Sequence, residues 1–241
     1  MAFVYRPGAV SRDMSKPKTE PADPRARLLA AALPHVAFDG WGEATFLAAT
    51  ADTGLTAAGA RVLCPRGALD LACDYHRAGD RAMRDALLAE DLGALRFRDR
   101  VAMAIRHRLS VTDREVVRRG VALFALPQHA LTGSRLLWET ADAIWTALGD
   151  TSRDVNWYTK RLTLSAVYSA TVLYWLGDDS EGQSATAAFI DRRIEDVMRF
   201  EKAKTNFRAS PWGKMLAGPM KLLDSIKAPA PAPDDLPGRK G

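Results

Sequence analysis

The fold of this chain is decided near its amino terminus, where residues 27–36 read RLLAAALPHV and are followed by Gly40-Trp41-Gly42 and by the turn Asp52-Thr53-Gly54-Leu55. The spacing of the apolar residues in 27–36 predicts a short amphipathic helix. A second helix fits between the two glycine-containing turns, and a third begins at Thr56. Two helices joined by a short turn that contains glycine form a helix-turn-helix. The sequence therefore predicts a helix-turn-helix unit over residues 24–66.

The remainder of the chain also favours helices. Alanine and leucine are abundant, and no segment alternates apolar and polar residues with the period of a strand. These features predict an all-α fold, in which a larger helical domain over residues 67–207 follows the helix-turn-helix unit. We expect helices at 24–38, 43–52, 56–64, 67–90, 94–109, 113–126, 133–148, 155–176, 184–206 and 211–226.

Several helix ends carry a local signal. Thr112 followed by Glu115 is typical of a capping box, and Ser184 can cap the helix that follows it. Pro127 and Gly177 are expected to end the helices that precede them.

Composition sets broad limits. The 241 residues are 47% hydrophobic and 26% charged, which is ordinary for a soluble globular protein. A formal net charge of +5 suits nucleic acid, a membrane surface or an acidic partner, and does not choose between them. The only cysteines are Cys64 and Cys73, so no disulfide framework is implied and a reducing compartment fits. Residues 1–23 and 227–241 are expected to form a disordered leader and a disordered tail.

The stretch Gly149–Arg161, GDTSRDVNWYTKR, joins a polar loop to a long apolar helix. A tryptophan next to a tyrosine is unusual in a solvated loop, because each ring left in water forgoes the burial that stabilises it. Trp157 and Tyr158 either fold back onto the core as a hydrophobic staple or form an aromatic anchor in a binding surface with a charged rim. The residues alone favour the staple.

The helix that follows has no charged residue between Arg161 and Leu176. A helix that is apolar or small all the way round must be covered on every side. It could be a central core helix, a homodimer interface, or the wall of an apolar pocket in which Tyr168 or Tyr174 gives a polar contact. The sequence leaves all three open and favours core or dimer.

The segment 211–226 combines large apolar residues with interspersed lysines, and Gly218-Pro219 is expected to kink it. Such a helix either lies in a membrane interface or packs on the protein's own surface. No segment of the chain reaches the roughly 20 apolar residues that span a bilayer. The residues expected at a membrane interface are Trp212, Lys214, Met215, Leu216, Met220 and Leu223.

Motifs for catalysis are missing from the sequence. It contains no phosphate-binding glycine loop and no Glu-x-x-His pair of the kind that holds a di-iron site in helix bundles. Cys64, Cys73 and His76 could be imagined as zinc ligands, but three residues at loose spacing favour no metal site. We therefore expect a protein that is not an enzyme and has no metal.

The order helix, glycine loop, helix, Gly-Leu-Thr turn and helix resembles the amino-terminal domain of TetR-type regulators. The third helix departs from that pattern, because Ala57-Ala58-Gly59-Ala60 carries no side chain that can read a base edge. Arg61 and Arg66 remain as candidate phosphate contacts. We expect a TetR-like scaffold that does not bind nucleic acid.

Four further motifs suggest a family: Asp154–Arg161 (DVNWYTKR), Val167-Tyr168, the loop Asp178-Asp179-Ser180, and Phe189–Ile194 (FIDRRI). From about residue 25 to residue 226, the chain resembles a family of ubiquinone (coenzyme Q) biosynthesis accessory proteins, the ninth-numbered protein of that pathway. The string NWYTKR is the most specific part of this resemblance.

The resemblance implies a TetR-like, all-helical and usually dimeric protein that has exchanged DNA binding for the binding of isoprenoid lipids. Its function would be to bind isoprenoid quinone intermediates, without catalysis, and to present them to the di-iron demethoxyubiquinone hydroxylase. It also implies a bound isoprenoid lipid or quinone precursor as ligand, and a membrane surface as a second partner. A location on the inner face of the bacterial cytoplasmic membrane is expected.

The resemblance also assigns residues to these roles and raises the anchor interpretation of Trp157 above the staple. A TetR-type regulator with a lipophilic effector and a helical scaffold without a ligand remain the alternatives. The expected partner-binding residues are Asp142, Ile144, Asp154, Asn156, Trp157, Tyr158 and Arg161, and the expected lipid-binding residues are Leu164, Val167, Tyr168, Thr171, Val172 and Trp175.

Overall fold

A computed structural model describes residues 23–209 together with Ala228 and Pro229. This part of the chain is all-helical, as predicted, and each helix predicted within it is present with ends no more than three residues from those expected. The predicted helix 211–226 lies outside the described residues. The elements are α1 (Pro24–Asp39), α2 (Glu43–Asp52), α3 (Ala57–Leu63), α4 (Ala68–Leu88), α5 (Phe97–Ser110), α6 (Arg114–Phe124), α7 (Ala130–Ala147), α8 (Val155–Leu176), the short 3-10 helix η1 (Glu181–Gln183) and α9 (Ser184–Ala209).

The start of α6 differs from the predicted capping box. Asp113, not Thr112, is the cap, and its carboxylate accepts a hydrogen bond from the Val116 amide at 3.0 Å. The Thr112 hydroxyl instead donates to the Leu109 carbonyl at 2.9 Å, so it closes the end of α5. The prediction was wrong because Thr112 lies in the turn after α5, where its hydroxyl is bonded to a carbonyl of that helix.

The start of α9 is also capped by other residues than predicted. Ser184 is the first residue of the helix. The amide of Thr186 is held by the Asp178 carboxylate at 2.8 Å, and that of Ala185 by the Ser180 hydroxyl at 3.0 Å. Gly177 does end α8, as expected. The loop before α9 therefore supplies the caps.

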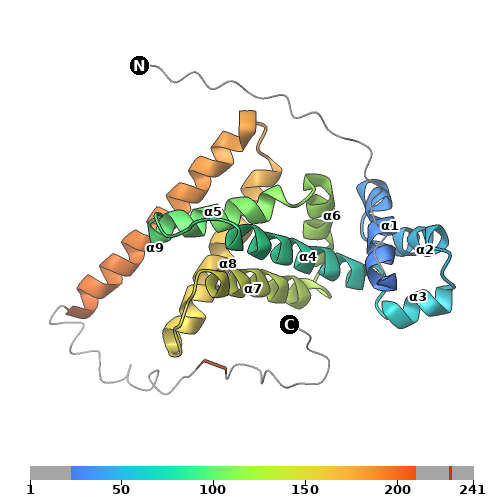
Figure 1. The fold of residues 1–241 in the computed structure, drawn as a ribbon, viewed down its shortest axis with the longest axis horizontal. Helices are drawn as coiled ribbons and strands as arrows, with labels where there is room; N and C mark the ends of the chain where they lie inside the picture. Colours follow the sequence, from blue (N-terminus) through green and yellow to red (C-terminus); the bar gives the residue numbers. More distant parts are fainter. Residues whose placement is uncertain (1–22, 210–227, 230–241) are drawn as a thin grey trace.

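Helices α1 to α3 enclose a small core of their own at one end of the molecule (Figure 1), in which Leu28, Val36 and Phe46 are fully buried. Gly40 has a φ of 69° at the end of α1, a left-handed conformation that favours glycine. The next residue, Trp41, reaches α6, where its Nε1 donates to the Val116 carbonyl at 3.3 Å. The helix-turn-helix unit is thereby fastened to the larger domain.

The larger domain is built from α4, α5, α7, α8 and α9, with α9 at the end opposite the helix-turn-helix unit (Figure 1). Its core includes Met83, Ile105, Ile144 and Ile190, each fully buried. Helix α4 connects the two cores, because its first turns pack with α1–α3 and its later turns with α5 and α7. Within residues 23–209, every helix is too short or too polar to cross a membrane.

Candidate functional site

An aromatic cluster lies where the start of α8 packs on α7. The Trp157 and Tyr158 rings meet edge to face with their centroids 4.8 Å apart. Both also contact Trp138 of α7, at centroid distances of 5.7 and 6.3 Å. All three rings are half-buried. Trp157 therefore packs on its own fold, as the staple interpretation expects, while its ring stays only half-buried, and its role as an anchor for a partner remains a prediction.

The Arg161 side chain packs against Trp157 of this cluster. Its Nε donates to Asp142 at 2.6 Å, and its Nη1 donates to Asp150 and to the Trp157 carbonyl, each at 3.1 Å. The guanidinium carbon lies 3.9 Å from the centroid of the Trp157 ring, which is cation–π geometry. Burial opposes the ionisation of Asp150, but hydrogen bonds from Lys160, Ser152 and Arg161 outweigh it and lower its pKa to about 2. Asp150 is therefore ionised at physiological pH.

The structure divides the predicted partner-binding residues. Asp154 caps α8 through the Asn156 amide at 3.0 Å, and both side chains are exposed. Ile144 is fully buried in the core and Arg161 is 2% exposed, so neither can form the outer surface of a docking face. They were misassigned because a sequence pattern does not show which side of the α7–α8 pair faces water. Trp138 was missed, since it recurs with Leu137, Ala141 and Trp145 at the three- and four-residue spacing that is typical of a core-facing stripe.

This face also receives part of the carboxyl-terminal segment. The Ala228 amide donates to the Arg153 carbonyl at 3.0 Å. Ala228 and Pro229 lie along a shallow groove that Trp157 and Arg161 also line.

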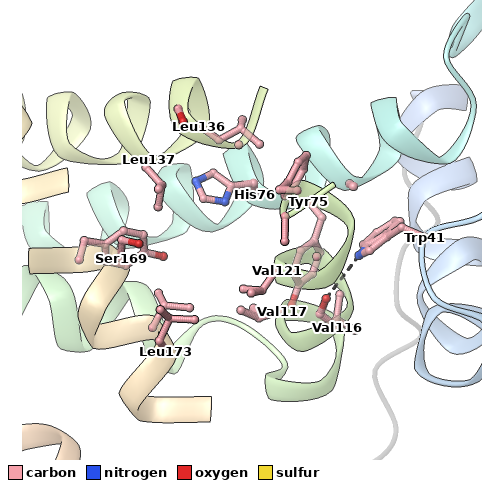
Figure 2. Close-up of a pocket in the computed structure, with 18 of the residues that line it drawn as sticks. Trp41, Tyr75, His76, Val116, Val117, Val121, Leu136, Leu137, Ser169 and Leu173 are labelled. Atoms are coloured by element: carbon pink, nitrogen blue, oxygen red, sulfur yellow. Dashed lines mark hydrogen bonds between the residues drawn. The ribbon is translucent and has the colours of Figure 1, made fainter. Parts of the chain in front are cut away.

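A cavity of about 370 Å³ lies between α4, α6, α7 and α8. Its lining is mostly apolar, and Figure 2 shows Val117, Val121, Leu137 and Leu173 around it. Trp41 lines the side next to the helix-turn-helix unit. The volume falls within the range of small-molecule sites, and an apolar lining suits a hydrophobic ligand.

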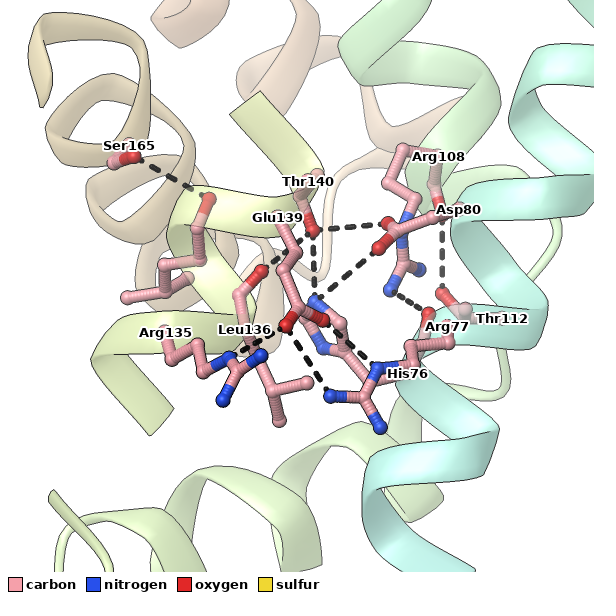
Figure 3. A network of polar contacts seen from close by, with 11 residues as sticks. His76, Arg77, Asp80, Arg108, Thr112, Arg135, Leu136, Glu139, Thr140 and Ser165 are labelled. Atoms are coloured by element: carbon pink, nitrogen blue, oxygen red, sulfur yellow. Dashed lines mark hydrogen bonds and ion pairs between the residues drawn. The ribbon is translucent and has the colours of Figure 1, made fainter. Parts of the chain in front are cut away.

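One wall of this cavity is polar, with His76, Arg108 and Tyr168 among its lining residues. Behind the wall lies a buried network (Figure 3). Arg108 Nε donates to Asp80 Oδ1 at 2.7 Å, and Thr140 Oγ1 donates to the same oxygen at 2.9 Å. His76 Nε2 lies 2.7 Å from Thr140 Oγ1. Burial and the positive charge of Arg108 lower the pKa of His76 to about 3, so its imidazole is neutral at physiological pH.

A second cavity of about 230 Å³ lies on another side of α8, against α5 and α9. Of the predicted lipid-binding residues, Tyr168 and Val172 line the first cavity, and Leu164 and Val167 line the second. Thr171 and Trp175 line neither. The Thr171 hydroxyl donates to the Val167 carbonyl at 2.8 Å, and the Trp175 Nε1 donates to Gln183 at 2.9 Å. The predicted lipid-binding residues therefore lie on a helix that lines both cavities, and the prediction included Tyr168 of the polar wall but not His76 of α4 or Arg108 of α5.

Three further sites were considered from the sequence: the phosphate contacts, a metal site and the membrane interface. The candidate phosphate contacts are already engaged, Arg61 with Glu43 and Arg66 with Asp70. Among the described residues, no group of three His, Cys, Asp or Glu side chains is arranged to hold a metal ion. The six expected membrane-interface residues lie outside the part of the chain that the structure describes.

The sequence matches the model of the COQ9 family over residues 130–201, the region of α7, α8 and most of α9. The chain is 32% identical over 117 residues to a probable ubiquinone biosynthesis protein coq9 of Dictyostelium discoideum, covering 48% of this chain and 38% of that protein. It is 28% identical over 180 residues to the ubiquinone biosynthesis protein COQ9 of Homo sapiens, covering 71% and 57% respectively. The corresponding protein of Drosophila melanogaster is 27% identical over 183 residues, covering 73% and 56%. The chain thus spans between about one third and three fifths of the length of these relatives.

The fold has a solved counterpart in a TetR transcriptional regulator from Nitrosomonas europaea. The TM-score is 0.58 over 72% of this chain and 97% of that one, with 19% sequence identity. Such a likeness speaks for the fold alone, and it confirms the predicted TetR-like arrangement. The family resemblance predicted from the motifs is confirmed as well, because the chain is similar in sequence to COQ9 ubiquinone biosynthesis proteins and has a TetR-like fold.

Proposed function

We propose that this protein is a non-catalytic accessory of ubiquinone biosynthesis, which binds isoprenoid quinone intermediates and presents them to the di-iron demethoxyubiquinone hydroxylase. One observation carries the proposal: the apolar cavity and the aromatic cluster are built on the same two helices, α7 and α8, which also carry the family match. The relatives named above bear the name of ubiquinone biosynthesis proteins.

The transfer of a prenylated ring compound from a membrane to an enzyme requires features of this kind. A polyprenyl ring compound is nearly insoluble in water, because exposing its chain to water is costly. An apolar cavity lowers the cost of moving such a molecule from a membrane to another protein. In this proposal the first cavity receives the ligand and the face around Trp157 docks the hydroxylase. The segment 211–226 contacts the inner face of the bacterial cytoplasmic membrane.

A homodimer is part of the proposal. Leu162 and Leu173 of α8 and Met198 of α9 are large apolar side chains that are more than half exposed. A second copy of the chain would cover them and reduce the apolar area in contact with water.

Organic extraction of the purified full-length protein, followed by mass spectrometry, tests the proposal. A polyprenyl quinone or its precursors should be recovered at close to one molecule per chain. Well-folded protein that yields no prenylated ring compound, even after incubation with one, would contradict it.

The second candidate function is a transcriptional regulator with a lipophilic effector, which the fold likeness favours. Against it stands the local geometry, because the two arginines suited to phosphate contacts are held by Glu43 of α2 and Asp70 of α4. Freeing them would cost these ion pairs. The third helix also offers only small side chains at the positions that would meet base edges.

A further inference from the structure

The hydrogen bonds at the polar wall of the first cavity determine which atoms of His76 and Thr140 carry a hydrogen. The neutral His76 ring carries one N–H, and Thr140 has one hydroxyl hydrogen to donate. That hydrogen has two possible acceptors, the Asp80 carboxylate at 2.9 Å and the Leu136 carbonyl at 3.2 Å. The carboxylate is both nearer and the stronger acceptor. With its hydrogen directed to Asp80, the Thr140 oxygen must accept, so His76 Nε2 is the nitrogen that carries the proton.

The other ring nitrogen of His76, Nδ1, is then a bare acceptor. Within the described residues, the His76 ring is bound by the Thr140 hydroxyl at Nε2 and by the Leu136 backbone, and Thr140 does not reach Nδ1. In Figure 2, the His76 ring lies at the edge of the cavity with one nitrogen turned toward the space beside Val117, Val121 and Ser169.

Donors lie on the same wall. The Tyr168 side chain is 3% exposed, and no hydrogen bond within the described residues satisfies its hydroxyl. Arg108 is 2% exposed, and its Nη1 likewise has no hydrogen-bond acceptor there, although Nε and Nη2 are engaged with Asp80 and the His76 carbonyl. A Cβ on Gly79 would clash with this Nη1, so the glycine leaves room for the guanidinium. On this wall, a mostly apolar cavity thus has a vacant acceptor on His76 and vacant donors on Tyr168 and Arg108, while the hydroxyls of Tyr75, Ser134 and Ser169 line the cavity elsewhere.

We propose that this wall binds the hydroxyl group of a prenylated phenol or hydroquinone, which donates to Nδ1 of His76 and accepts from Tyr168 or Arg108. The inference rests on the proposed function and narrows its ligand to rings that carry a hydroxyl, so that a demethoxyubiquinone would be bound in its reduced, hydroquinone form. A hydroxyl satisfies an acceptor and a donor at once. The prenyl chain lies along the apolar lining formed by α6, α7 and α8.

A fully oxidised quinone or a methyl ether fits the same wall less well. Each has acceptor oxygens and no hydroxyl hydrogen, so Nδ1 of His76 would lose water without gaining a partner. A buried polar group left unpaired weakens binding by roughly tenfold or more.

A matched pair of ligands tests this on the unaltered protein. The dissociation constants of 2-geranylphenol and of its methyl ether are measured by isothermal titration calorimetry with the full chain. The ether is the more apolar compound, so a cavity without a vacant acceptor would bind it at least as tightly as the phenol. We expect the phenol to bind about tenfold more tightly.

Two variants locate the contact. His76→Phe should bring the affinity for the phenol down to that for the ether and leave the ether's affinity unchanged. Tyr168→Phe should weaken the binding of the phenol and leave the affinity for the ether unchanged. Tyr174→Phe is the control, because Tyr174 stacks on Phe189 and does not line the cavity.

The outcomes separate the inference from the proposed function. Equal binding of phenol and ether to the wild type, or a preference that persists in both His76→Phe and Tyr168→Phe, would overturn the inference and leave lipid binding standing. If folded wild-type protein binds neither compound and yields no lipid on extraction, both the inference and the proposed function are contradicted. Should His76→Phe fail to fold, the ligand pair on the wild type and on Tyr168→Phe decides.

Discussion

Arg161 is a cation that the fold has removed from water, with its side chain 3% exposed. Removing a guanidinium from water costs several kcal/mol unless carboxylates and hydrogen bonds compensate for it. Asp150 and Asp142 supply the negative charge, and the Trp157 ring lies against the guanidinium. The resemblance placed Arg161 among partner contacts, whereas its geometry makes it the residue that positions Trp157.

The Asp150 carboxylate gives this arrangement a pH dependence. Its pKa is about 2 in the folded protein and 3.8 in the absence of structure, so the stabilisation is complete above about pH 4 and is lost as the pH falls toward 2. Asp150→Asn should therefore lower the free energy of unfolding at pH 7 by about 2 kcal/mol. Urea denaturation from pH 7 to pH 3 measures the difference from wild type. It should be constant down to about pH 5 and shrink below pH 4, and a difference that does not shrink would show that Asp150 acts through packing.

The polar wall left only one trace in the sequence. Cys73, Asp80 and Leu87 recur every seven residues and all three are buried on α4. An aspartate at a core position of such a stripe needs a buried cation or donor as partner. The sequence could have suggested that, but the partner Arg108 lies 28 residues away on another helix, and only the fold brings the two together.

At the scale of elements, the helices were predictable because their signals are local. Apolar spacing, glycines and prolines depend on neighbours a few residues away. The role of α8 was not predictable in this way. It turned out to be core and cavity wall together, since Tyr168 faces one cavity, Val167 another, and Leu162 is exposed. A helix without charges carries no information on which neighbour covers which side.

The contact between α6 and α7 depends on one glycine. A Cβ added to Gly133 would lie 2.8 Å from the Cβ of Phe124 and 3.3 Å from its Cγ. Gly133→Ala should therefore push the two helices apart and lower the free energy of unfolding by about 1 to 3 kcal/mol. Thermal or urea denaturation measures this change. Because Phe124 and Gly133 both line the first cavity, the affinity for a prenylated phenol should fall as well.

Gly120 of α6 provides the matched control. A Cβ there would meet only the Trp41 Nε1 atom at 3.8 Å, an ordinary contact. Alanine is favoured over glycine in a helix by up to about 1 kcal/mol. Gly120→Ala should therefore be neutral or stabilising. If both substitutions stabilised the protein, the close approach of α6 and α7 would not constrain residue 133.

At the scale of the whole molecule, the two cores are joined rather than merely adjacent. Leu71 of α4 lies in the helix-turn-helix core and Met83 in the larger one, so a single helix is buried in both. Trp41 adds a second link, because it donates to Val116 and packs against Tyr75 with the ring centroids 6.0 Å apart. The same tryptophan lines the cavity. The helix-turn-helix unit therefore closes one side of the cavity.

The first cavity and the proposed docking face lie at different positions along α8. Trp157 precedes Tyr168 by 11 residues, which corresponds to about 16 Å of helix axis. The second cavity lies between them, with Asn156 at one end and Val167 at the other. Ligand binding and partner binding should therefore respond to different substitutions, although one helix carries both.

Trp157→Ala tests this separation and the docking face itself. Partly buried aromatic residues with a rigid support are typical of positions that dominate binding energy, so the loss should weaken hydroxylase binding by at least tenfold. The ring also contacts Trp138 and Arg161, so the free energy of unfolding should fall by about 1 to 3 kcal/mol. The amount of co-purified lipid should not change. Pull-down of the hydroxylase, urea denaturation and lipid extraction give the three readouts on the same preparation.

Phe38→Ala is the control for this substitution, because Phe38 is 83% exposed on α1, within the helix-turn-helix unit and away from the aromatic cluster. It removes an exposed aromatic ring of similar character and should leave hydroxylase binding intact. If Trp157→Ala protein bound the hydroxylase as tightly as the wild type, the aromatic cluster would not be part of the docking face. A variant that lost lipid together with the partner would instead mean that the two sites are coupled through α8, and the distance between them along the helix would no longer argue for independence.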